Sequence, residues 1–305
     1  MLVIVCPGQG SQSAGFLTPW LELPEFAESI AASSSYSGID IAKHGTVSEA
    51  ETIRETSVAQ PLLVGAGIAT LAALRGAGMQ NFSGAAGHSV GEVTASVAAG
   101  ILTPEAGMRF VTKRGTAMAS AAAKMAAGMV AVLGGEQAEV VDYLIAIGLT
   151  PVNFNGAGQI VAAGPVDAVA ALQGAPMDGT RVIPLQVAGA FHTSHMDPAV
   201  DELRVFANTI ETADPMVKIW SNSDGETVSS GKKYLDSLVS QVSHPVRWDL
   251  CMASMLAAGV TALIEVSPAG TLVGLAKRGM PGVETLALKT PDQIPAALEL
   301  AAGHA

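Results

Sequence analysis

Cysteines and aromatic residues are scarce in this sequence. Its 305 residues include two cysteines, Cys6 and Cys251, and aromatic residues make up 4 % of the chain. Two cysteines are too few for the disulfide framework of a small secreted domain, and these two lack the spacing of metal ligands. We therefore interpret both as reduced core residues and expect a cytoplasmic protein.

Basic residues are in short supply as well. There are 16 Lys and Arg residues against 27 Asp and Glu residues, which gives a formal net charge of −11. A nucleic-acid binder needs a basic face for the phosphate backbone, and an anionic membrane attracts basic segments. The composition therefore argues against both partners, and docking to an acidic protein would require a local basic patch.

Uninterrupted apolar stretches of membrane-spanning length are not evident. The uncharged run 143–166 is broken by glycine, proline and asparagine residues. The apolar start, residues 1–6, is short, lacks a basic region and runs into Pro7, unlike a signal peptide. Because 49 % of the residues are hydrophobic and only 14 % are charged, we expect a large folded core.

The apolar runs, glycines and prolines predict an α/β core. Residues 2–5 and 82–86 are typical of strands buried on both faces, and a glycine turn and a helix at 92–99 follow the second run. The order strand, turn, helix indicates a parallel sheet covered by helices. Further strands are predicted at 217–221 and 262–266, and further helices at 62–75, 104–118, 197–210, 234–242, 246–258, 268–277 and 294–302.

A different pattern begins near residue 127. Strands are predicted at 129–133, 150–154, 159–163 and 181–187, and helices at 136–147 and 166–172. This β-α-β-β-α-β order is that of a ferredoxin-like domain. We therefore expect an α/β-hydrolase-like core, residues 1–126 and 188–305, which is interrupted by a ferredoxin-like subdomain at 127–187.

The segment Gly87-x-Ser89-x-Gly91 has the pattern of a nucleophile elbow. In such an elbow a serine occupies a strained turn between a strand and a helix, and the flanking glycines allow the backbone segments to approach closely. The apolar run before the pattern and the predicted helix after it are the required context. Ser89 is therefore a candidate nucleophile, and a purely structural glycine turn is the alternative.

A serine nucleophile needs a base, which is usually histidine. Four of the six histidines are not candidates for this base. We interpret His44 as a polar-loop residue, His88 as a packing residue, His244 as a turn residue and His304 as a tail residue. His192 and His195 lie in a loop between a predicted strand and a predicted helix, where a catalytic group can be presented. Two alternatives remain open, a capped helix start with incidental histidines and a metal pair that lacks a third ligand.

Two further segments carry possible chemistry. Gly8-Gln9-Gly10 does not match a dinucleotide loop, because Ser13 stands where the third glycine is needed, and a phosphate-loop lysine is missing too. A loop whose backbone N–H groups face a developing oxyanion fits better. Arg114, on a predicted helix in an apolar stretch, is either a bidentate partner for a substrate carboxylate or a solvated helical charge.

Together these segments resemble the malonyl-CoA:acyl carrier protein transacylases of fatty-acid and polyketide synthesis. The resemblance extends over nearly the whole chain, and several independent motifs occur in the family's order. The matching segments are Pro7-Gly8-Gln9-Gly10-Ser11-Gln12, Ala59-Gln60-Pro61, Gly87-His88-Ser89-Val90-Gly91-Glu92, Lys113-Arg114-Gly115 with Met118, Ala190-Phe191-His192, and Gln241 with Pro245-Val246-Arg247-Trp248.

The resemblance implies a role for each matched site residue. Ser89 would be the nucleophile, His192 the general base and acid, and Arg114 the partner of the malonyl carboxylate. His195 would be a bystander. The remaining matched residues would line the substrate site (Phe191 and Met118), supply the backbone N–H groups of the oxyanion hole (Gln9 and Val90) and orient the histidine through a main-chain carbonyl (Gln241).

The resemblance also implies the reaction. A malonyl group would pass from malonyl-CoA through Ser89 to the phosphopantetheine thiol of acyl carrier protein, with no cofactor of the enzyme's own. Phe191 looks like the malonyl-selective form of its loop, because a bulky ring would crowd an α-methyl branch at a cost of about 1–3 kcal/mol. The acidic carrier would dock on a basic rim, for which the candidates are Lys113, Arg247, Lys277 and Arg278.

Three other functions are compatible with parts of this pattern. A serine acyl hydrolase would use the same elbow but usually an acidic third member. The acyltransferase subunit of a malonate decarboxylase complex shares the motifs and differs in its carrier. A non-catalytic scaffold should have lost Ser89, His192 or Arg114, and all three are present.

Overall fold

The larger sheet of the protein is parallel throughout. The computed structural model describes every residue except 188 and 305, so the predicted limits of the second core segment lie outside the described residues. The sheet has the order β7-β2-β1-β8-β9. Its strands are β1 (Leu2–Cys6), β2 (Gly84–Gly87), β7 (Lys218–Ile219), β8 (Ala262–Glu265) and β9 (Glu284–Ala287).

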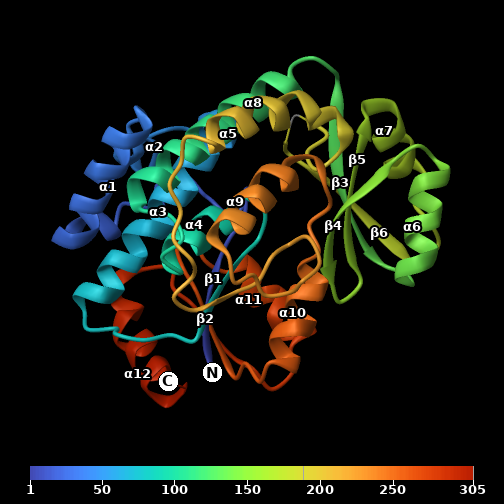
Figure 1. The fold of residues 1–305 in the computed structure, drawn as a ribbon. Coiled ribbons are helices and arrows are strands. Elements are labelled where there is room, and N and C mark those ends of the chain that lie inside the picture. Colours follow the sequence, from blue (N-terminus) through green and yellow to red (C-terminus); the bar gives the residue numbers. More distant parts are fainter. Residues whose placement is uncertain (188, 305) are drawn as a thin grey trace.

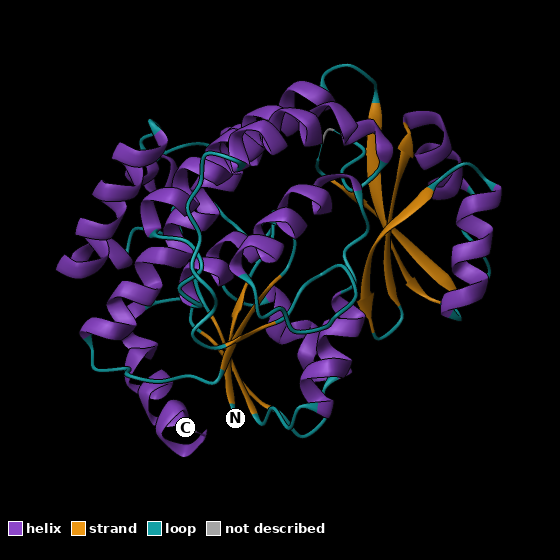
Figure 2. Ribbon diagram, in the orientation of Figure 1, coloured by secondary structure: helices purple, strands orange, loops and turns teal. Residues whose placement is uncertain are grey.

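Helices cover both faces of this sheet (Figures 1 and 2). Side chains alternate between the two faces of a strand. Accordingly, Leu2 and Ile4 of β1 enter one apolar core, and Val3 and Val5 enter another. The first core is shared with α1 (Pro24–Ser37), α2 (Ile41–Thr46), α3 (Thr56–Gly76), α4 (Gly91–Ala98), α5 (Pro104–Ala122), α8 (Asp197–Ala207), α9 (Gly231–Ser240) and α12 (Ile294–His304). The second core is shared with α10 (Trp248–Ala257) and α11 (Thr271–Gly279).

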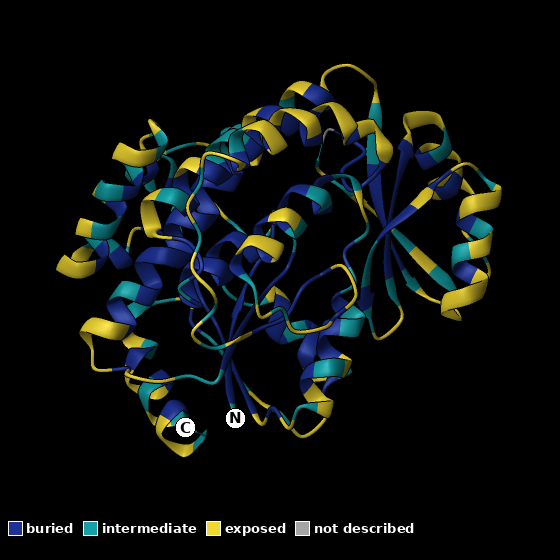
Figure 3. Cartoon of the chain, in the orientation of Figure 1, coloured by how far each residue is buried: buried dark blue, intermediate teal, exposed yellow. Residues whose placement is uncertain are grey.

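The second sheet is antiparallel and has the order β4-β5-β3-β6. Its strands are β3 (Ala127–Gly134), β4 (Thr150–Gly156), β5 (Gln159–Pro165) and β6 (Thr180–Leu185), and its helices are α6 (Gln137–Ala146) and α7 (Val166–Gly174). One face packs against these two helices, and the other contributes Met129, Ala131 and Val161 to the main core. The central strands of both sheets are buried, whereas the edge strands β6 and β9 and the outer faces of α6 and α7 are partly exposed (Figure 3).

The predicted fold class is confirmed, since a parallel sheet is combined with an antiparallel insertion in the predicted β-α-β-β-α-β order. We propose the limits of the inserted subdomain at residues 127 and 187.

Helix α3 is long and apolar enough to cross a membrane by length and composition, and 83 % of its most apolar window is buried inside the protein. It is packed between α1, α4 and α5.

Several predicted elements were wrong in extent or were missed. Helix α3 begins at Thr56 and contains Pro61, although a start at Leu62 was predicted; a proline near a helix start removes only one backbone bond. Strand β7 is two residues long because it pairs only with the short strand β2. His44 lies on α2 and not in a loop. Helices α1 and α2 and the edge strand β9 were not predicted.

Candidate active site

Ser89 occupies a sharp turn between β2 and α4. Its φ is +53°, a left-handed conformation that costs energy for a residue with a side chain. The turn is possible because its flanks are glycines: a Cβ on Gly87 would lie 2.1 Å from the carbonyl carbon of Gly91, and a Cβ on Gly91 would lie 2.1 Å from the carbonyl oxygen of Cys6. The hydroxyl is thereby presented at the carboxyl edge of the parallel sheet, as a nucleophile elbow requires.

His192 lies within hydrogen-bond distance of this hydroxyl. The distance from Ser89 Oγ to His192 Nε2 is 2.8 Å, and the distance from His192 Nδ1 to the carbonyl oxygen of Gln241 is 2.7 Å. A carbonyl can only accept a hydrogen bond, so Nδ1 carries the proton and Nε2 presents its lone pair to the serine. Burial and then the charge of Arg114 lower the pKa of His192 to about 3, so the ring is neutral at physiological pH.

Arg114 is a buried cation beside the serine, with 1 % of its surface exposed. Its guanidinium donates to the side-chain oxygen of Gln60 at 2.7 Å and to that of Gln241 at 2.9 Å, and Nη2 lies 3.5 Å from Ser89 Oγ. Burial lowers the pKa of Arg114 to about 10, partly offset by Glu92, so it stays charged. Among the described residues no carboxylate lies within ion-pair distance of it. The alternative of a solvated helical charge was therefore wrong.

The other residues expected at the site lie around the same serine. Gln9, Met118 and Phe191 line a narrow cleft of about 70 Å³ together with Ser89 and His192. Within the part of the chain that the structure describes, neither the backbone N–H of Gln9 nor that of Val90 donates to another protein group. Both N–H groups are thus available to an oxyanion.

A wider cleft of about 360 Å³ adjoins the narrow one. Both are lined by Gln9, His88, Asn153 and Leu185, and the wider cleft extends to Arg278 on α11. The other predicted rim cations differ in their surroundings. Lys113 pairs with Glu202, Arg247 pairs with Asp249, and Lys277 is exposed.

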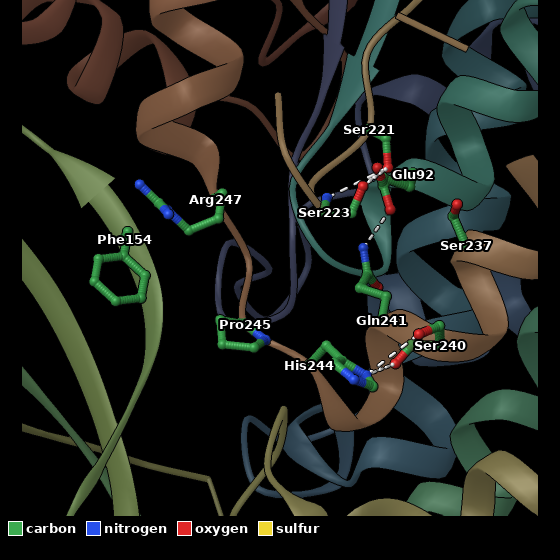
Figure 4. Close-up of a pocket in the computed structure, with 10 residues that line it drawn as sticks. All are labelled: Glu92, Phe154, Ser221, Ser223, Ser237, Ser240, Gln241, His244, Pro245 and Arg247. Carbon is green, nitrogen blue, oxygen red and sulfur yellow. Dashed lines mark hydrogen bonds between the residues drawn. The ribbon is translucent and has the colours of Figure 1, made fainter. Parts of the chain in front are cut away.

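A further cavity, of about 420 Å³, is not lined by Ser89, His192 or Arg114, and Figure 4 shows the residues that line it. Its lining includes Glu92 and Gln241, and the amide of Gln241 points to the carboxylate of Glu92 in this view. Burial raises the pKa of Glu92 to about 8, against the lowering effects of the Asn222 hydrogen bond and the charge of Arg114.

Three buried polar residues at the site were not assigned a role from the sequence. Gln60 bonds to Arg114, Glu92 bonds to Gln241, and Asn222 holds the turn at Ser89. The side-chain oxygen of Asn222 accepts the Ser89 N–H at 2.8 Å, and its amide donates to the Gly87 carbonyl at 2.8 Å. A polar residue inside an apolar helix was the available signal for Gln60; no signal pointed to Asn222.

Among the described residues, no other histidine side chain hydrogen-bonds to Ser89. His88 is buried, with Nε2 2.9 Å from Asn155 Oδ1, as expected of a packing residue. His195 is exposed and bonds to Thr193, and His244 bonds to the Ser240 carbonyl. Among the residues with described positions, no group of three His, Cys, Asp or Glu side chains could hold a metal ion.

Comparison with known proteins now identifies the family. Residues 3–290 match the model of the family described as acyl transferase domain. This chain belongs to the acyl transferase family. It is 45 % identical over 300 residues to the malonyl CoA-acyl carrier protein transacylase of Mycobacterium tuberculosis (strain ATCC 25618 / H37Rv), which covers 96 % of this chain and 98 % of that protein.

Solved structures agree with this assignment. The crystal structure of MCAT from Mycobacterium tuberculosis has a TM-score of 0.94 at 44 % identity and covers 99 % of each chain. A malonyl-transacylase in complex with its type II PKS acyl-carrier protein has a TM-score of 0.91 at 30 % identity, covering 98 % of this chain and 99 % of that one. Membership of the malonyl-CoA:acyl carrier protein transacylase family, which the motifs indicated, is thus confirmed.

Proposed function

We propose that this protein transfers the malonyl group of malonyl-CoA to the phosphopantetheine thiol of acyl carrier protein, through a malonyl ester on Ser89. It would thereby supply extender units for fatty-acid or polyketide synthesis. One observation carries the proposal: the buried, charged Arg114 lies 3.5 Å from the serine hydroxyl. A cation in that position is suited to an acyl group that ends in a carboxylate.

The first half-reaction follows from the geometry. His192 takes the proton of Ser89 Oγ, and the oxygen attacks the thioester carbonyl. The N–H groups of Gln9 and Val90 donate to the resulting oxyanion, and each such donor is worth about 3–4 kcal/mol in other acyl-transfer enzymes. The carbon–sulfur bond then breaks, His192 returns the proton to the CoA thiolate, and the malonyl ester of Ser89 remains.

The second half-reaction reverses these steps with a new thiol. The carrier thiol gives its proton to His192 and attacks the ester carbonyl, and Ser89 leaves as the alkoxide and regains the proton. The two half-reactions share one site, so the kinetics should be ping-pong. The wider cleft, which adjoins the narrow cleft at Ser89, supports this use of one site, because a long thioester arm needs room to reach the serine. Both substrates bring their own reactive groups, so we propose no cofactor.

Arg114 and Phe191 would set acyl specificity. The guanidinium pairs with the malonyl carboxylate, and the ring of Phe191, which is 5 % exposed, lines the same narrow cleft. That position supports rejection of an α-methyl branch by about 1–3 kcal/mol. We also propose a cytoplasmic location, in accord with the free, buried thiols of Cys6 and Cys251.

Two rival functions differ in the acceptor. A hydrolase would pass the acyl group to water, and a malonate decarboxylase subunit would pass it to another carrier. The decisive experiment is intact-mass analysis after mixing with malonyl-CoA, followed by addition of acyl carrier protein. We expect one malonyl increment on the enzyme, its transfer to the carrier, and weaker labelling by methylmalonyl-CoA. Free malonate as the main product would overturn the proposal.

The neutral state of His192 predicts an unusual pH dependence. An ordinary histidine base would lose activity below pH 6.5, whereas this ring has a pKa of about 3. With acetyl-CoA as donor, whose acyl group has no carboxylate for Arg114 to hold, the rate constant for acylation of Ser89 should therefore stay level through pH 6.5 and fall only at lower pH. Between pH 6.5 and pH 3 the ring of His192 binds a proton in the unfolded chain but not in the folded one, so the free energy of unfolding declines as the pH falls through this range. The rate constant must therefore be measured by rapid mixing, before the protein unfolds. An acid limb centred near 6.5 would contradict the expectation.

A further inference from the structure

Glu92 is a buried carboxylate near the site that does not touch the reacting atoms. It lies in the first turn of α4 and is 1 % exposed. Its Oε1 accepts the backbone N–H of Asn222 at 2.7 Å, and its Oε2 accepts the side-chain amide of Gln241. The backbone N–H of Glu92 donates to the Ser89 carbonyl at 3.0 Å, but among the described residues no hydrogen bond joins the Glu92 carboxylate to Ser89 or Arg114. An effect of Glu92 on the reaction must therefore pass through its partners.

The side-chain amide of Gln241 connects Glu92 with Arg114. Its nitrogen donates to Glu92, to the side-chain oxygen of Asn222 at 3.2 Å and to the Ser89 carbonyl at 3.3 Å. Its oxygen accepts from Arg114 Nη2 at 2.9 Å. If the Gln241 amide were turned by half a revolution, its N–H groups would face the N–H groups of the guanidinium, and its oxygen would face the oxygens of the Glu92 carboxylate. Neither contact could form a hydrogen bond. The carboxylate of Glu92, the closest of the three acceptors around the nitrogen, thus favours one orientation of this amide.

We infer that Glu92 is a positioning residue for the acyl carboxylate: through the amide of Gln241 it sets the direction of the Arg114 guanidinium. This inference rests on the proposed function, since it concerns the malonyl group. Two amide oxygens, those of Gln60 and Gln241, hold the guanidinium, and only the second belongs to an amide that also bonds to an acidic side chain. With both in place, Arg114 keeps its direction toward Ser89 before substrate arrives.

The substitution Glu92→Gln separates this role from simple packing. The backbone N–H of Asn222 is fixed and still needs an acceptor, so the oxygen of the new amide should face it. The nitrogen of the new amide then faces the nitrogen of Gln241, and this donor–donor contact should displace the Gln241 amide from its position against Arg114. The elbow should remain in place, because the side-chain bonds of Asn222 to Ser89 and Gly87 do not involve Glu92.

The test compares malonyl-CoA with acetyl-CoA, which lacks the carboxylate, at a pH above the raised pKa of Glu92. We expect Glu92→Gln to lower the ratio of kcat/KM values, malonyl over acetyl, by about 10- to 100-fold, the size of effect expected when a hydrogen bond to a charged group is lost. The ratio does not depend on the amount of folded enzyme. If that variant does not fold, Glu92→Asp keeps the charge but withdraws it from Gln241, and the ratio should fall there too.

Glu265→Gln is the matched control. Glu265 is equally buried and accepts backbone N–H bonds from Gly270, Leu272 and Val273. Its substitution should lower stability and leave the malonyl-to-acetyl ratio unchanged. An unchanged ratio in the Glu92 variants, or an equal drop in the control, overturns the inference. If the wild-type enzyme itself shows no malonyl preference, the proposed function fails instead.

Discussion

Substitution of Ser89 by alanine should eliminate the covalent acyl-enzyme and reduce malonyl transfer by on the order of 10⁶-fold, as removal of the nucleophile does in serine hydrolases. The hydroxyl is the group that His192 deprotonates, at 2.8 Å from its Nε2. The oxyanion donors and Arg114 remain, but they have no bond to form with the acyl carbon. Intact-mass analysis after mixing with malonyl-CoA should show an unmodified chain.

The variant should fold normally, which makes the result interpretable. Alanine tolerates the left-handed turn as well as serine does, and the backbone bond from residue 89 to Asn222 is kept. Ser96→Ala is the control, because Ser96 is a buried serine on the following helix whose hydroxyl bonds only to the Val93 carbonyl among the described residues. A malonyl increment that persists in Ser89→Ala and maps to another residue would refute the assignment.

The parts of the site that could be predicted are those with a local physical requirement. A nucleophile elbow needs small residues around the serine, and this need is visible as Gly87 and Gly91. The β1 and β2 strands could be predicted because strands buried on both faces need apolar runs. Strand β9 was missed because it is a short, partly exposed edge strand. Helix α1 was missed because its run of serines gives no clear apolar pattern and is more typical of a loop. In the folded chain the hydroxyls of Ser34 and Ser37 bond to carbonyls one turn earlier in the helix.

The parts that could not be predicted depend on contacts between distant segments. Asn222 holds the turn at Ser89 from 133 residues away. Burial of Arg114 results from packing of α5 between α1, α3 and α8, and no local pattern separates it from a solvated arginine. Glu92 belongs to a recognised motif, yet its link to Gln241 spans 149 residues and exists only in the folded chain.

Replacement of Arg114 by alanine should damage transfer of malonyl far more than transfer of acetyl. Loss of one partner of a buried charge pair costs about 2–5 kcal/mol, which corresponds to a decrease of about 30- to 5,000-fold in kcat/KM for malonyl-CoA. Acetyl-CoA has no carboxylate to lose, so its kcat/KM should change much less. The measurement is kcat/KM for each donor with the same carrier protein.

Two other variants distinguish the charge from the geometry of the guanidinium. Arg109→Ala is the control, because Arg109 lies on the same helix, is exposed and pairs with Glu105. It should leave both donors unaffected. Arg114→Lys keeps a positive charge but not the planar fork that bonds Gln60 and Gln241 together, so malonyl transfer should recover only in part. Equal losses for malonyl and acetyl in Arg114→Ala would mean that Arg114 supports the fold of the site and does not bind the acyl carboxylate.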